Sequence, residues 1–210
     1  MTMAEAITAF VALFVIIDPI GLAPLFVALT QGASASARRA IAVRACVISL
    51  ILLTLFGLAG EAILGFLGIS MPAFRIAGGI LLFLTALDML FERRTKRREG
   101  QASDSVTDPE DDPSIFPLAT PLIAGPGSIA TMILLTGQSS GDVAYLAMVH
   151  GVMAAVLACV LVMFLLGGVI ERGLGPTGIM VVTRLLGMLL AALSVQFVLD
   201  GIRDLGIMPL

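Results

Sequence analysis

The sequence has little charge, and this scarcity excludes an ordinary water-soluble protein. Only 13% of the 210 residues are charged while 59% are hydrophobic, and the mean hydropathy is +1.08; about a quarter of the residues of a soluble domain are charged. The chain has no Trp and one Tyr, so Leu, Ile, Val, Ala and Met carry the apolar excess, together with 22 glycines. Small residues let helix backbones approach each other in lipid. The composition therefore predicts an all-α polytopic bundle in a lipid bilayer.

Residues suited to catalysis or metal binding are also scarce. His150 is the single histidine, and Cys46 and Cys159 both lie within apolar stretches, far from any other metal-ligating residue at suitable spacing. The sequence contains no HExxH, Walker or GxSxG motif. We therefore expect no enzymatic activity, no metal and no cofactor, and we interpret the cysteines as small buried hydrophobes. The formal charge of -3 gives no indication of nucleic-acid binding.

The charged residues separate six apolar segments. Residues 113–141 and 143–170 contain no Asp, Glu, Lys or Arg, and both exceed the roughly 20 residues that cross a bilayer. The residues before the first apolar segment include Glu5 but no Lys or Arg, whereas a signal peptide begins with a positively charged region. We therefore interpret this segment as a membrane span and not as a cleaved signal peptide. The six spans are expected near residues 4–29, 41–60, 72–91, 115–135, 146–170 and 179–202.

The basic residues indicate how the spans are oriented. If six spans alternate in direction, ten of the 12 basic residues fall on one face, and only Arg75 and Arg203 on the other. Such an excess marks the cytoplasmic face, so both termini are predicted to be periplasmic. The polar segment 92–114 should be a flexible cytoplasmic linker within one membrane domain. It would join a first three-span repeat at residues 1–91 to a second at residues 115–210.

Two motifs recur in the same order in the two halves. Arg75-Ile76-Ala77-Gly78 aligns with Arg184-Leu185-Leu186-Gly187, and Asp18-Pro19-Ile20-Gly21 lies in span 1 as Gly125-Pro126-Gly127-Ser128 lies in span 4. Because each repeat has three spans, the second copy must cross in the opposite direction. Inverted repeats are typical of secondary transporters, which bind substrate near the midplane where interrupted helices meet.

Proline and glycine should interrupt the helices of spans 1 and 4. Proline removes a backbone donor, and glycine tolerates conformations that other residues avoid. The freed backbone groups must face protein, water or a ligand, which predicts a substrate or ion site at the two breaks; the alternative is two kinked helices packed by Ser, Thr and water. The candidate site residues are Asp18, Pro19, Gly21, Thr120, Pro121, Gly125, Pro126, Gly127 and Ser128.

The chemistry of a helix break favours a small zwitterion. The start of a half-helix suits a carboxylate, and the carbonyls that end the preceding half suit a cation or an ammonium group. Asp18 lies deep in a span, where a carboxylate must be paired, hydrated or protonated; it is predicted to be a proton or cation site, a helix N-cap, or both. Arg75 and Arg184, near the starts of spans 3 and 6, are candidates for gating or ion pairing, or else snorkelling anchors.

Four ordered motifs resemble the MarC family, which is named after multiple antibiotic resistance. They are Phe14-Val15-Ile16-Ile17-Asp18-Pro19-Ile20-Gly21, Phe74-Arg75-Ile76-Ala77-Gly78-Gly79-Ile80, the run from Pro117 to Ser128, and Gly175-Pro176-Thr177-Gly178. The resemblance implies a bacterial or archaeal integral membrane protein of about six spans, located in the inner membrane of a Gram-negative host. One branch of the family looks like neutral amino-acid transporters coupled to cations, which points to the same candidate residues at the two breaks.

Two functions follow as hypotheses. The first is a secondary transporter of small neutral amino acids or similar zwitterions, coupled to protons or to sodium. The second is a non-transporting inner-membrane interaction or assembly protein, in which the breaks are features of helix packing.

Overall fold

The structure is a computed structural model that describes residues 2–105, 112–139 and 141–206. Within these ranges every regular element is a helix, as the composition predicts. In chain order the elements are α1 (Met3–Ile17), α2 (Pro19–Leu29), α3 (Ala35–Phe66), α4 (Met71–Leu90), α5 (Arg93–Ser105), η1 (Ser114–Ile123), α6 (Pro126–Thr136), α7 (Val143–Leu165) and α8 (Gly167–Asp204).

Five helical segments of the described chain are long and apolar enough to cross a membrane. They are Met3–Leu29, Ala35–Phe66, Met71–Leu90, Val143–Leu165 and Arg172–Asp204. Taking η1 and α6 as one span bent by 57° raises the number to six. A membrane bundle of five or six helical spans is therefore confirmed.

Two expected spans are too short. The second extends over Ala35–Phe66 and the last over Arg172–Asp204, because charged residues outside the expected limits are themselves part of the helices. Arg39 and Glu61, for example, lie outside residues 41–60 but inside α3. A helix can continue beyond the hydrocarbon layer when its charged residues are near the interface.

Side-chain caps explain where several helices begin. Thr2 and Glu5 form a capping box at the start of α1, and Ser70 accepts a hydrogen bond from the Ala73 amide at the start of α4. Asp142 accepts hydrogen bonds from the Ala144 and Tyr145 amides at the start of α7, at 2.8 and 3.3 Å. Each of these oxygens satisfies amides that have no acceptor within the helix.

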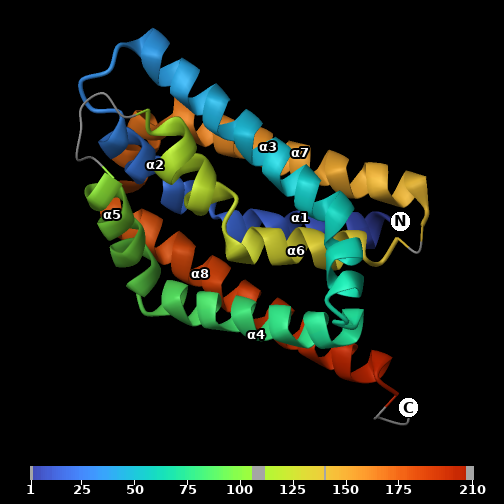
Figure 1. Ribbon diagram of the computed structural model, residues 1–210. Helices are drawn as coiled ribbons and strands as arrows, with labels where there is room; N and C mark the ends of the chain where they lie inside the picture. The colour runs from blue at the N-terminus through green and yellow to red at the C-terminus, as the bar shows by residue number, and fades with distance from the viewer. Residues whose placement is uncertain (1, 106–111, 140, 207–210) are drawn as a thin grey trace.

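The helices form three layers, with the interrupted spans in the middle (Figure 1). α3 packs with α7 on one side and α4 with α8 on the other, and α1 and α6 lie between them. The first span is 61% buried along its most apolar window, against 22–33% for the other long spans. Exposed apolar side chains such as Leu58 of α3 and Leu185 of α8 face outward. The interrupted first span, which has backbone groups without helical partners at its break, is thus largely kept away from lipid.

α4 and α8 make the most extensive helix contact, and they run antiparallel. A Cβ atom at Gly79 would lie 2.8 Å from the Ser194 carbonyl oxygen, and one at Gly187 would lie 2.9 Å from the Met89 Cβ. Any side chain at Gly79 or Gly187 would therefore push the two helices apart. The close approach explains why glycine occupies these positions, as it does in many membrane helix pairs.

The expectation of a flexible linker is wrong for its first part. Residues Arg93–Ser105 form helix α5, which packs against α2, α4 and η1. Residues 106–111 lie outside the described part of the chain. The first and last described residues lie at one end of the bundle, and α5 lies at the other (Figure 1). The composition of α5 suggests a solvated segment, but two of its arginines, Arg94 and Arg98, are buried. Both are part of the candidate site described below.

Candidate functional site

Asp18 separates α1 from α2 and interrupts the first span. Its backbone is left-handed, with φ 59° and ψ 65°, and Pro19 begins α2. Asp18 is 1% exposed, and its side chain accepts a hydrogen bond from the Gly21 amide at 3.1 Å. A Cβ atom at Gly21 would lie 2.2 Å from the Asp18 carboxylate. The Asp-Pro-Ile-Gly motif is therefore a helix break with an aspartate N-cap, and glycine leaves room for the cap.

The second break separates η1 from α6. Phe116 and Thr120 have non-helical backbone angles within η1, and α6 begins at Pro126. The Ser128 hydroxyl accepts a hydrogen bond from the Gly125 amide at 3.0 Å and donates one to the Ile123 carbonyl at 2.7 Å. These bonds hold the turn around the start of α6. Because Pro126 has no amide hydrogen, the first-turn amides of α6 that have no acceptor within the helix are those of Gly127 and Ser128, at its positive dipole end.

The two breaks lie against each other beside a cavity. A Cβ atom at Gly127 would lie 2.7 Å from the Ile16 Cδ1, so the start of α6 directly contacts the end of α1. The adjacent cavity has a volume of about 400 Å³, which suits a small metabolite. It is lined by residues of α1, α4, α5, η1 and α6, namely Ile16, Leu81, Leu84, Thr85, Asp88, Arg94, Arg97, Arg98, Pro121, Leu122, Ile123, Gly125, Pro126, Gly127 and Ser128.

Two arginines of α5 reach the end of α1. Arg98 donates from Nη1 to the Asp18 carboxylate at 3.1 Å and from Nη2 to the Ile17 carbonyl at 3.0 Å. Arg94 donates to the Ile16 carbonyl and to the Met89 sulfur. The last carbonyls of a helix accept no hydrogen bond from within the helix, and they form its negative dipole end. The end of α1 is thus a cation site made by the chain, and guanidinium groups of the same chain occupy it.

The site has more positive than negative charge. Burial lowers the pKa of both Arg94 and Arg98, and the charge of Asp18 acts in the opposite direction. Arg98 is paired with Asp18, and Arg97 is paired with Asp88 at 2.9 Å. Arg94 is 8% exposed and forms no ion pair with any carboxylate in the part of the chain that the structure describes. A buried charge without an opposite charge is costly, so this arginine needs a further explanation.

Eight of the nine residues predicted at the two breaks fall into two groups. Five of them line the cavity: Pro121, Gly125, Pro126, Gly127 and Ser128. Asp18, Pro19 and Gly21 form the other break, where Arg98 lies between Asp18 and the cavity. Thr120 is exposed and lies outside the cavity lining. The structure therefore brings the two motifs together at one place but does not present Asp18 to a ligand.

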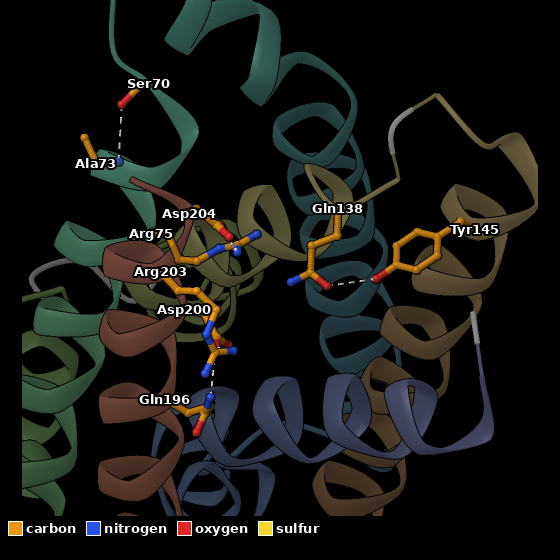
Figure 2. A network of polar contacts seen from close by, with 9 residues as sticks. All are labelled: Ser70, Ala73, Arg75, Gln138, Tyr145, Gln196, Asp200, Arg203 and Asp204. Carbon is orange, nitrogen blue, oxygen red and sulfur yellow. Dashed lines mark hydrogen bonds and ion pairs between the residues drawn. The ribbon is translucent and has the colours of Figure 1, made fainter. Parts of the chain in front are cut away.

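Arg75 and Arg184 lie away from the cavity and form ion pairs. Arg75, at the start of α4, pairs with Asp204 at the end of α8, and Arg184 of α8 pairs with Glu92 just after α4. Figure 2 shows the Arg75 end of the molecule, where the same polar surface carries Asp200 with Gln196, and Tyr145 with Gln138.

The linker arginines were missed as site residues. The charge of the five basic residues between 93 and 98 predicts a cytoplasmic segment, but charge alone does not indicate which of these side chains are buried. The signal that could have found them is spacing. Arg94 and Arg98 are four residues apart and share one face of a helix, and Arg97 also reaches the cavity, while Arg93 and Lys96 lie outside its lining.

The described residues show no arrangement for holding a metal ion. No group of three or more His, Cys, Asp or Glu side chains clusters in the ranges that the structure covers. Cys46 is buried, Cys159 is partly buried, and both are free thiols. The chemistry of the cavity therefore rests on guanidinium, carboxylate, hydroxyl and backbone groups.

Comparisons with known proteins identify the family. A family model described as "MarC family integral membrane protein" matches residues 3–206. The chain is 38% identical to a UPF0056 membrane protein of Aquifex aeolicus, over 95% of this chain and 92% of the relative. It is 37% identical to the UPF0056 inner membrane protein YhgN of Escherichia coli K12, over 96% of this chain and 98% of the relative. No solved structure is significantly similar. The chain therefore belongs to the MarC family of integral membrane proteins.

Proposed function

We propose that this MarC family protein is a secondary transporter of small neutral amino acids or similar small zwitterions. The observation that carries the proposal is the cavity at the contact of the two helix breaks, bounded by Gly127 against Ile16. Interrupted helices that meet in the interior are the usual place for the substrate of a secondary transporter. The cavity is lined by polar groups that suit a zwitterion: free amides at the start of α6, guanidinium groups and the Asp88 carboxylate.

The charged ends of a zwitterion can be assigned to opposite parts of the lining. The carboxylate would lie at the start of α6, where free amides and the helix dipole attract an anion. The ammonium group would face Asp88, which is the acidic residue of the lining. In this assignment Asp18 has a coupling role, through a proton or a sodium ion that competes with Arg98 for its carboxylate.

The contact between α4 and α8 supports an inverted repeat. Arg75 and Arg184 occupy equivalent places in the two halves of the sequence. Arg75 pairs with Asp204, the last residue of α8, and Arg184 pairs with Glu92, just beyond the end of α4. The antiparallel course of α4 and α8 fits two copies that cross in opposite directions. We infer from these reciprocal ion pairs that alternating access involves a movement of one half against the other.

We also propose the cellular arrangement on indirect grounds. The Escherichia coli relative is named as an inner membrane protein, and the basic residues of this chain favour a cytoplasmic α5. Both termini would then be periplasmic. The chain offers no motif for enzymatic chemistry, so the proposal is transport without catalysis.

Flux through the purified protein tests the proposal. Radiolabelled L-alanine or glycine uptake is measured in proteoliposomes with an imposed proton gradient, an imposed sodium gradient, or neither, and protein-free liposomes provide the background. We expect gradient-dependent uptake of at least one of the two amino acids. The absence of such uptake under all conditions would favour the alternative, a non-transporting interaction or assembly protein.

A pair of serine variants links the flux to the cavity. Ser128→Ala removes the hydroxyl that holds the start of α6 and should lower uptake several-fold. Ser114→Ala changes an equally buried serine of the same bent span that lies outside the cavity lining, and it should leave uptake unchanged. Equal effects of both variants would separate transport from this cavity.

A further inference from the structure

The cavity lining has an excess of positive charge that the proposed function leaves unexplained. Three guanidinium groups line it, those of Arg94, Arg97 and Arg98, against one carboxylate, that of Asp88. The start of α6, with its positive dipole end, forms another wall. An ammonium group would meet mostly charges of its own sign in this space.

Each carboxylate at the site is already paired. Asp18 accepts from Arg98 at 3.1 Å, and both side chains are nearly inaccessible. Asp88 pairs with Arg97 at 2.9 Å, toward the surface, where the Arg97 side chain is 59% exposed. Arg94 is the buried guanidinium that has only neutral partners among the described residues, the Ile16 carbonyl and the Met89 sulfur. Arg94 is therefore the buried group of the site that lacks an opposite charge.

We propose that Arg94 is the receptor for an oxyanion, with the start of α6 facing it across the cavity, so that the ligand is recognised by its carboxylate and its ammonium group is dispensable. The inference rests on the proposed function, because it takes the same cavity as the binding site, and it defines the substrate class as small carboxylates, with or without an ammonium group. A buried guanidinium binds a carboxylate through short charge-assisted hydrogen bonds.

The cavity size agrees with a small ligand. A space of about 400 Å³ accommodates a three-carbon carboxylate with water, since ligand pockets commonly measure about 300–1,000 Å³. The apolar part of the lining, Leu81, Leu84 and Leu122, suits a short aliphatic side chain. Of the three arginines that line the cavity, Arg98 is paired with Asp18 and Arg97 with Asp88, so the unpaired charge at Arg94 matches a ligand with a single negative charge.

A ligand series of constant size separates the two charges. L-alanine carries both charges, L-lactate replaces the ammonium group with a hydroxyl, and L-alaninamide keeps the ammonium group without a carboxylate. Binding to purified protein in nanodiscs is measured by calorimetry. We expect L-lactate to bind within about tenfold of L-alanine and L-alaninamide to bind at least about a hundredfold more weakly. Binding of L-alaninamide as tight as that of L-alanine would overturn the proposal, and so would failure of L-lactate to compete with L-alanine.

Three variants of α5 assign the effect to one side chain. Arg94→Gln should raise the Kd for both L-alanine and L-lactate by about tenfold or more, and Arg94→Lys, which keeps the charge, should recover part of the loss. Arg93→Gln is the matched control, because its guanidinium lies over the Phe91 ring and not in the cavity. Equal effects of Arg93→Gln and Arg94→Gln would overturn the assignment.

A second measurement needs no ligand. Thr85 lines the cavity, and Thr85→Cys is introduced after Cys46 and Cys159 have been replaced by Ala. The reaction rates with an anionic and a cationic methanethiosulfonate are each divided by the rate for free cysteine. We expect the anionic reagent to be favoured, and Arg94→Gln to lower this preference about tenfold, because a unit charge a few ångströms away acts through a low effective dielectric.

The two measurements distinguish this inference from the proposed function. An anionic preference that depends on Arg94, with carboxylate binding but no gradient-dependent flux, would contradict transport and leave the oxyanion site standing. Flux of alanine with equal reactivity toward both reagents, before and after Arg94→Gln, would overturn the oxyanion site and leave transport standing. No reaction with either reagent would overturn the accessible cavity itself.

Discussion

Replacing Asp18 with Asn removes a charge and almost nothing else. The side chains have the same shape, and Asn is as good an N-cap as Asp, so the hydrogen bond from the Gly21 amide can persist. The substitution removes the ion pair with Arg98. In this pair the Asp18 side chain is 2% exposed and the Arg98 side chain is 7% exposed. After the substitution, the Arg98 guanidinium stays buried with the Ile17 carbonyl and an amide as its partners.

The burial of this pair determines the size of the effect. Removing one partner of a buried ion pair costs about 3–5 kcal/mol, because the other charge is left uncompensated. For chains of about 150–250 residues, 1 kcal/mol corresponds to roughly 2–4 °C in the unfolding midpoint. We therefore expect Asp18→Asn to lower the apparent Tm by about 6–20 °C. The double variant Asp18→Asn/Arg98→Gln removes both charges and should recover at least about half of the loss.

The pair of Asp88 and Arg97 provides a matched control. Its nitrogen and oxygen are 2.9 Å apart, but the side chains are 24% and 59% exposed, and such pairs contribute about 0–1 kcal/mol. Asp88→Asn should therefore shift the midpoint by about 4 °C or less. Because the chain has no Trp, unfolding is followed through reaction of the buried Cys46 with a thiol-reactive dye. Equal shifts for Asp18→Asn and Asp88→Asn, or no recovery in the double variant, would refute the reasoning.

Two further predictions concern packing and orientation. Gly127→Ala should destabilise the protein by about 1–3 kcal/mol, because its Cβ would lie 2.7 Å from the Ile16 Cδ1. Gly151→Ala, on the open face of α7, should be neutral or stabilising by up to about 1 kcal/mol. Similar unfolding midpoints for both variants in the same dye assay would argue against close contact of the two breaks. Single cysteines at Gly141 and Gln101 should react with impermeant maleimide from the periplasmic and the cytoplasmic side respectively, and labelling from the reverse sides would overturn the orientation.

Local sequence signals were sufficient to predict the breaks. Pro19 and Gly21 beside Asp18, and Pro126 between Gly125 and Gly127, interrupt helices for steric reasons that act within a few residues. The structure has both breaks at these motifs. The segments of low charge likewise predicted a bundle of several spans, and the structure has five or six, because crossing a bilayer requires a long apolar stretch whatever its partners are.

The surroundings of the breaks could not be predicted in the same way. Burial of Arg94 and Arg98 depends on where α5 packs, and that is a contact with residues about 80 positions away in the sequence. A charged segment has no apolar periodicity to reveal that one face is covered. Thr120 differs from its prediction in the opposite way: it is a polar residue of a predicted site motif, but it lies at the surface. Tertiary packing determines which polar groups face a cavity.

The position of α5 connects the site to the α4–α8 pair. α4 ends at Leu90 and α5 begins at Arg93, so the arginines that reach α1 follow α4 after a very short turn. Glu92 lies in this turn with a φ of 61° and pairs with Arg184 of α8. The turn is therefore tied to both helices of the outer layer. In the transport that we propose, a displacement of α4 and α8 relative to α1 would pull the guanidinium groups from the Ile16 and Ile17 carbonyls and from Asp18, and these oxygens would then be free to bind a cation. The same turn would link the proposed movement of the two halves to the charge of the cavity.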